Sequence, residues 1–395
     1  MKVVAFPAKQ SALAAIAAVV LFSLLTFGQT PQSAPDRQPL NLLVLGDSVS
    51  WGQGLKDEHK AWYLVKRWLQ QTSGRDVYER IEAHSGAEIG SPEDDHDDQV
   101  MLLDGELSRA VPTINEQITN ALRAFARPAQ IDLVLVDGCI NDLDSRRLLN
   151  AANTREGIRE LAQAKCGPPV EALLRRITST FPRAHVIITG YYPIITDKSA
   201  NDLFMRALAK RFYQPEPGTV RRMNDKTLRA RLIAISSEWY QTSTQMLSNA
   251  ARNVDTQLAT NGSHQRVLFA DVAFRPEHAF AAAQSRLWGF DASALRKLLI
   301  AFSFGHVTLR ANDERRSQRS ELCDRQFKSA FAQAPEQEQA QKDRLMRCRL
   351  AAVAHPNRKG AAMYADAIGN QLKLIMREAG WLNDSRASAS PASPL

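Results

Sequence analysis

The sequence has few cysteines, no large excess of one charge and only one long apolar run. With four cysteines in 395 residues, it is not a small disulfide-dense scaffold, and with 19 glycines and 18 prolines it is not collagen-like. A hydrophobic content of 44% and a charged content of 23% exclude a wholly disordered chain. The single apolar run excludes a polytopic membrane protein. The length fits one large α/β domain or two smaller domains.

The sequence also lacks motifs for binding metals and nucleic acids. No CxxC or HxxxH spacing occurs, so we expect no zinc site. We expect no other metal or organic cofactor either. The acidic run at 93–98 could form a calcium loop, but its spacing fits no known cage, so a solvated loop is favoured. The formal net charge of +8 comes from scattered arginines, some of them interleaved with Asp313 and Glu314. No nucleic-acid-binding motif accompanies them, so a nucleic acid is not an expected partner.

The one long apolar run lies near the N-terminus. Residues 1–10 carry two lysines and no acid, and Ala12–Phe27 is almost wholly apolar. This pattern predicts a signal peptide or N-terminal membrane anchor, with a linker, over residues 1–35. The run is long for a signal and short for a membrane span, so both alternatives stay open, with cleavage favoured. We expect an exported protein, which is periplasmic, secreted or anchored to the envelope.

An even number of cysteines in an exported chain predicts two disulfides. The four cysteines allow three connectivities, and pairing of sequence neighbours closes the shortest loops. We therefore predict two bonds, which are Cys139–Cys166 and Cys323–Cys348.

Strands alternate with helices along residues 36–382, which we expect to form one domain with insertions. Residues 383–395 are a low-complexity tail that we expect to be disordered. The alternation predicts a parallel sheet with helices on both faces. Such sheets bind ligands at the carboxyl ends of their strands. The predicted strands are 40–45, 77–83, 131–136, 186–189 and 267–270, and the predicted helices are 57–71, 113–125, 170–181, 224–260 and 359–379.

Chemically useful residues follow three of these strands. Gly46-Asp47-Ser48 lies where the first strand ends. A serine at this edge of the sheet, with its backbone N–H at the start of the next turn, meets the requirements for a nucleophile. Gly86 follows the second strand, and Asn141 follows the strand 131–136; each could donate a hydrogen bond to an oxyanion. His355 precedes the last helix and could act as a general base. Each motif alone also fits an ordinary turn, cap or structural histidine.

Taken together, four segments resemble the conserved blocks of the SGNH, or GDSL-type, hydrolases. These segments are GDSVSWGQG, AHSGAEIG, GCIND and AAVAHPNRKGAAMYADAI. The resemblance implies a three-layer α/β/α fold with a central, flavodoxin-like parallel sheet, and hydrolysis of carboxylic esters. It also implies that Ser48 is the nucleophile, His355 the base, and Gly86 and Asn141 oxyanion donors. No GxSxG elbow occurs, so the usual α/β-hydrolase is not indicated.

The chain departs from the family pattern at one position. The family commonly has Asp three residues before the histidine, where this chain has Ala352. We therefore predict a Ser48–His355 dyad in which the Ala352 carbonyl orients the ring, with activity falling below a pH of about 6.5. A carboxylate from elsewhere is the rival, and Asp324 is its best candidate because the Cys323–Cys348 bond would bring it near.

Three functions remain open at this point. The first is an exported esterase or lipase acting on a small-molecule or lipid ester, and the second is a carbohydrate O-deacetylase on the same frame. The third is an envelope binding protein without turnover, which only the missing Asp favours. We further expect the segment 276–342, inserted before His355, to cover part of the active-site mouth.

Overall fold

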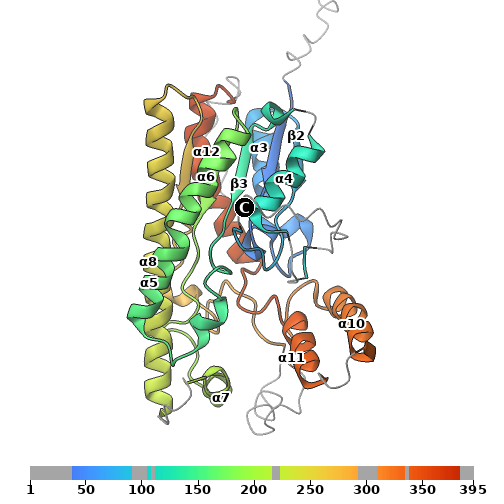
Figure 1. Cartoon of the computed structure of the whole chain (residues 1–395), viewed down its shortest axis with the longest axis vertical. Coiled ribbons are helices and arrows are strands. Elements are labelled where there is room, and N and C mark those ends of the chain that lie inside the picture. The colour runs from blue at the N-terminus through green and yellow to red at the C-terminus, as the bar shows by residue number, and fades with distance from the viewer. Residues whose placement is uncertain are drawn as a thin grey trace, which may run out of the picture. The chain divides into compact units, whose positions relative to one another are not determined.

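The computed structural model describes residues 38–90, 105–107, 112–125, 127–215, 223–291, 309–333 and 338–382 (Figure 1). The leader and linker at 1–35, the acidic run at 93–98 and the tail at 383–395 lie outside these ranges. Within them, no helix is both long enough and apolar enough to cross a bilayer.

Five parallel strands form the central sheet in the order β2-β1-β3-β4-β5, the order of flavodoxin-like folds. Continuous apolar runs produce the central strands, because helices cover both of their faces; all four residues of β3 are buried. The predicted strands are confirmed, with small shifts at their ends. Their bounds are β1 Leu40–Val44, β2 Val77–Ile81, β3 Leu133–Val136, β4 His185–Thr189 and β5 Val267–Ala270.

Helices cover both faces of the sheet. On one face α12 (Arg358–Glu378) packs against α3 (Ala61–Ser73) and against β4 and β5. On the other face α6 (Pro168–Thr180) and the long α8 (Asp225–Thr260) contact β4 and each other. Each predicted helix is confirmed in outline, and the three-layer α/β/α arrangement is present (Figure 1).

The remaining helices flank these layers. The α-helices are α2 Ser48–Trp51, α4 Ile114–Ala124, α5 Arg155–Cys166, α7 Leu203–Phe212, α10 Arg316–Gln333 and α11 Glu338–Arg349. The 3₁₀ helices are η1 Asp57–His59, η2 Pro128–Gln130, η3 Ser145–Leu149 and η4 Pro276–His278.

Both predicted disulfides are confirmed. The Cys139–Cys166 bond joins the loop after β3 to the end of α5. The Cys323–Cys348 bond joins α10 to α11, two helices that the sequence did not predict. Among the residues whose side chains are described, the two helices share a small apolar cluster with Leu107 around this second bond.

Candidate active site

Ser48 begins α2 immediately beyond the carboxyl end of β1. The preceding residue, Asp47, caps this short helix by accepting the Val49 N–H at 2.8 Å. The Tyr191 hydroxyl donates to the other Asp47 oxygen at 2.7 Å. Ser48 is therefore fixed from both sides of its own turn.

The turn is also fixed from the neighbouring strand. Asp137, the residue directly after β3, accepts the backbone N–H groups of Asp47 at 2.7 Å and Ser50 at 2.8 Å. Gly46 has φ +122°, and a Cβ there would lie 1.9 Å from Asp137 Oδ1, so glycine is required. Gln117 of α4 completes the frame by bonding both the N–H and the carbonyl of Gly46.

Asp47 and Asp137 form a fully buried carboxyl pair. Burial raises the pKa of both groups, and the neighbouring Asp47 charge raises the pKa of Asp137 further. The hydrogen bonds that both accept act in the opposite direction. Sequence reasoning missed Asp137, although its place at the end of a buried strand, level with Gly46, was a usable signal.

His355 contacts Ser48 directly: its Nε2 lies 2.8 Å from Ser48 Oγ. The backbone of the histidine loop is held on two sides. Trp288 N–H donates to the His355 carbonyl at 2.7 Å, and the Tyr192 hydroxyl donates to the Ala354 carbonyl at 2.9 Å. Nucleophile and base, 307 residues apart in the chain, are thus within hydrogen-bond reach.

The other ring nitrogen, His355 Nδ1, is enclosed and has no hydrogen-bond partner among the described residues. It makes no hydrogen bond to the Ala352 carbonyl, which accepts the backbone N–H of His355 at 3.0 Å, so the orienting role of this carbonyl stays a prediction. Burial lowers the pKa of His355 to about 4; the nearby backbone of Val353 and Ala352 raises it, Arg319 lowers it, and Asp313 raises it.

Asp324, the predicted rival to the Ala352 carbonyl, instead pairs with Arg349 on α11. Asp313 is the acidic residue beside the histidine loop. A Cβ on Gly54 would lie 2.7 Å from the Ala352 Cβ and 2.9 Å from the Asp313 Cβ, so these side chains occupy one small space. Sequence reasoning missed Asp313 because it lies in the insertion and has no fixed spacing to His355.

Three hydrogen-bond donors lie at the same edge of the sheet. The backbone N–H groups of Ser48 and Gly86 make no hydrogen bond to any described residue, and Gly86 has φ +85°. The Asn141 amide donates one hydrogen to the Ala87 carbonyl at 2.9 Å, which orients its second hydrogen independently of any ligand. This bond also ties the loop after β3 to the loop after β2.

A buried ionic network lies behind the nucleophile turn. Glu106 is fully buried and accepts bonds from Gln53, from the Gly54 N–H and from Trp51. Arg319 of α10, also fully buried, donates to Glu106 at 2.7 Å. It also binds both oxygens of Asp313, at 2.9 and 2.5 Å. Part of the insertion is thereby attached to the turn that follows Ser48.

Comparison with known proteins gives structural likenesses only. No family model matches the chain, and no curated protein matches it. The chain is similar to the extracellular lipase of Streptomyces rimosus, at 16% identity and TM-score 0.33, covering 63% of this chain and 87% of the lipase.

Two further solved structures are similar to this chain. One is a phospholipase A1 of Streptomyces albidoflavus, at 12% identity and TM-score 0.35, covering 65% of this chain and 90% of that protein. The other is a family 3 carbohydrate esterase of Clostridium thermocellum, at 14% identity and TM-score 0.30, covering 69% of this chain and 96% of the esterase. The assignment of function rests on this chain's own side chains.

Proposed function

We propose that this protein is a serine hydrolase that cleaves carboxylic esters and belongs among the SGNH-type enzymes. The observation that carries the proposal is the 2.8 Å contact between Ser48 Oγ and His355 Nε2. The N–H groups of Ser48 and Gly86, which bond no described residue, and the Asn141 amide support it, since all three follow strands at the same edge of the sheet. A nucleophile within reach of a base, with donors for a developing negative charge, is the minimum apparatus for acyl transfer.

The reaction begins when His355 Nε2 takes the proton of the Ser48 hydroxyl. Ser48 Oγ then attacks the ester carbonyl carbon, and the carbonyl oxygen becomes an oxyanion that accepts from Ser48 N–H, Gly86 N–H and Asn141 Nδ2. Collapse of this tetrahedral intermediate expels the alcohol, which His355 protonates. His355 then takes a proton from water as that water attacks the acyl-serine, and the second collapse releases the acid while His355 returns the proton to Ser48 Oγ.

The proposed catalytic pair is a dyad, because Nδ1 of His355 has no acceptor among the described residues. The charge of the transient imidazolium is then stabilised through space rather than by a direct hydrogen bond. The backbone of Val353 favours this charge most, Arg319 disfavours it, and the backbone of Ala352 and the Asp313 carboxylate favour it less strongly. A dyad of this kind gains less stabilisation from its surroundings than a triad with a carboxylate on Nδ1.

The decisive experiment is hydrolysis of chromogenic esters of increasing acyl length, together with release of acetate from acetylated xylan. We expect turnover by the wild-type protein and loss of at least about 10³-fold in kcat for Ser48→Ala, since the nucleophile is gone. Ser179→Ala, at an exposed position on α6 away from the proposed machinery, is the control. Equal activity of Ser48→Ala and wild type would overturn the proposal, and the preferred substrate separates an esterase or lipase from an O-deacetylase.

Asn141 gives a second test of the same site. We expect Asn141→Ala to lower kcat by roughly 10²–10³-fold with a smaller change in KM, because its amide acts on the oxyanion rather than on the bound ester. Steady-state kinetics on one short-chain ester measure this split. Asn150→Ala, in a surface loop, is the control, and an unchanged kcat for Asn141→Ala would restrict Asn141 to a structural role in its turn.

A further inference from the structure

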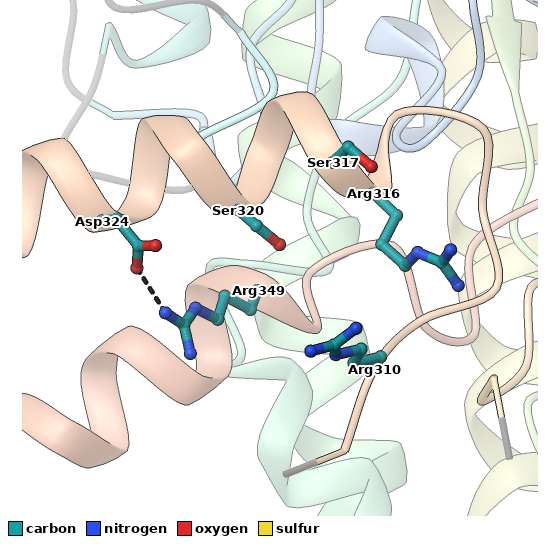
Figure 2. A pocket seen from close by; sticks show the side chains of 6 residues that line it. All are labelled: Arg310, Arg316, Ser317, Ser320, Asp324 and Arg349. Atoms are coloured by element: carbon teal, nitrogen blue, oxygen red, sulfur yellow. Dashed lines mark hydrogen bonds and ion pairs between the residues drawn. The ribbon is translucent and has the colours of Figure 1, made fainter.

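A cavity outside the proposed active site lies between the first turns of α10 and the end of α11. Its volume is about 320 Å³, and Figure 2 shows the side chains that surround it. Among the described residues its lining is strongly basic and contains no apolar side chain. The lining residues are Arg310, Arg316, Ser317, Ser320, Asp324 and Arg349.

The three arginines of this cavity are not fully neutralised. Arg316 pairs with Asp291, and Arg349 pairs with Asp324. Arg310 makes no ion pair or side-chain hydrogen bond with any residue in the described ranges. Three positive and two negative groups leave the site with a net charge of +1.

Two of the arginines have donors to offer a ligand. Arg310 is exposed, so its whole guanidinium fork is available. The Nη2 of Arg349 pairs with Asp324, and its Nη1 makes no hydrogen bond or ion pair with any described residue. In Figure 2 the guanidinium groups of Arg310 and Arg316 and the side chain of Arg349 surround one space, to which Ser320 presents its hydroxyl.

The chemistry of this lining matches an oxyanion. The guanidinium fork binds phosphate and carboxylate groups through two parallel hydrogen bonds, and serine hydroxyls add single donors. The cavity also lies at the start of the 18-residue α10, where the helix dipole favours negative charge. Its volume of about 320 Å³ exceeds what one phosphate ion needs and has room for a small organic body.

The cavity is connected to the proposed active site through the backbone. Phe290 pairs with Ala311, beside Arg310, and Leu287 pairs with Pro356, beside His355. The segment 287–291 therefore runs between the histidine loop and one wall of the cavity. None of the six lining residues belongs to the proposed catalytic machinery.

We propose that this cavity binds a small organic anion through a phosphate or carboxylate group held by Arg310 and Arg349. Binding is independent of the ester chemistry at Ser48 and does not require that chemistry. The two sources of the oxyanion, a phosphate ester or an organic acid, share this chemistry and are separated by experiment.

The test is isothermal titration calorimetry of the full chain at low ionic strength. The probes are inorganic phosphate, glycerol 3-phosphate and glucuronate, with glucose as the neutral control. We expect at least one anion to bind at millimolar concentration or tighter, and glucose not to bind. Tighter binding of glycerol 3-phosphate than of glucuronate identifies a phosphate-bearing ligand, and the reverse order identifies a carboxylate-bearing one.

Variants make the proposal falsifiable. We expect Arg310→Gln to weaken the binding of the best anion about tenfold and Arg310→Lys to weaken it less, because lysine keeps the charge but loses the fork. Arg252→Gln, an exposed arginine on α8, is the control and should bind as the wild type does. Absence of binding for every anion would overturn the proposal, and so would equal weakening by Arg310→Gln and Arg252→Gln.

Discussion

The His355 side chain determines how the proposed enzyme should respond to acid. Burial lowers its pKa to about 4, well below the ordinary value of 6.5, because the enclosed ring disfavours a positive charge. The neutral form needed for a general base therefore persists as the pH falls. We expect kcat/KM to stay near its maximum down to about pH 5 and to reach half of it near pH 4. This replaces the limit near 6.5 that the sequence indicated, and a half-maximum at 6.5 would contradict it.

A substitution at position 352 tests the assignment of the acidic limb to His355 by raising the pKa of its ring. Ala352→Asp places a carboxylate where the family pattern has one, so we expect it to raise the pKa of His355 and move the acidic limb to higher pH. Ala352→Asn is the control of equal size without charge. Because Ala352 is fully buried, circular dichroism must accompany both variants. If the acidic limb of the pH–rate profile is the same in both variants, a charge at position 352 does not change the pKa of His355.

At the scale of elements, the packing of α5 on α8 depends on one buried acid. Glu238 of α8 accepts hydrogen bonds from Arg159, at 2.6 Å, and from Arg155, both on α5. These bonds, that to Arg159 foremost, lower the pKa of Glu238 to about 2. A folded-state pKa below the unfolded value gives stability that is present above about pH 4.5 and is lost as the pH falls toward 2.

We therefore expect Glu238→Gln to lower the free energy of unfolding by roughly 1.5–3 kcal/mol at pH 7, the range for hydrogen bonds to charged groups. The difference from wild type should shrink between pH 4.5 and 2. Urea unfolding at several pH values measures both effects. Glu156→Gln, which removes only an exposed partner of Arg159, is the control. A pH-independent difference would indicate that shape rather than charge explains the loss.

The sequence predicted the helices and strands that have a regular pattern of apolar residues, because these residues are buried between the layers of the fold. The strand 267–270 matches β5 at both ends, and α4, α8 and α12 agree within a residue or two. The sequence did not predict α10 and α11, since they are held by the Cys323–Cys348 bond and by buried charge instead of an apolar face.

The same distinction applies to the candidate site. The contact between Ser48 and His355 could be anticipated because strand ends and a helix start carry local signals, whereas their catalytic roles stay a prediction. Asp137 and Asp313 were missed because their roles depend on which backbone groups and side chains meet them in three dimensions. The role of the Ala352 carbonyl stays a prediction, since this carbonyl accepts the backbone N–H of His355 and Nδ1 has no hydrogen bond among the described residues.

At the scale of the whole molecule, the insertion is joined to the core through buried charge. Arg319 reaches from α10 to Glu106, which in turn holds the Gln53 and Gly54 turn just beyond Ser48. The described part of the segment 276–342 thus contacts the edge of the sheet that carries the proposed chemistry. Whether it covers the mouth stays a prediction, which a change in the acyl-length profile on its deletion would support.

Arg319 is the residue on which this junction depends most. Arg319→Met would remove a fully buried cation and leave Asp313 without its bidentate partner. Breaking a buried pair by removing one member costs about 3–5 kcal/mol, because the remaining charge stays desolvated. We expect a loss of that size in the free energy of unfolding, measured by urea denaturation, whereas Arg325→Met, an exposed arginine on the same helix, should change it little. Adding Asp313→Asn to Arg319→Met should recover part of the loss by removing the stranded charge. If the double variant is no more stable than Arg319→Met, the cost comes from lost packing, and buried charge is not what joins the insertion to the active-site edge.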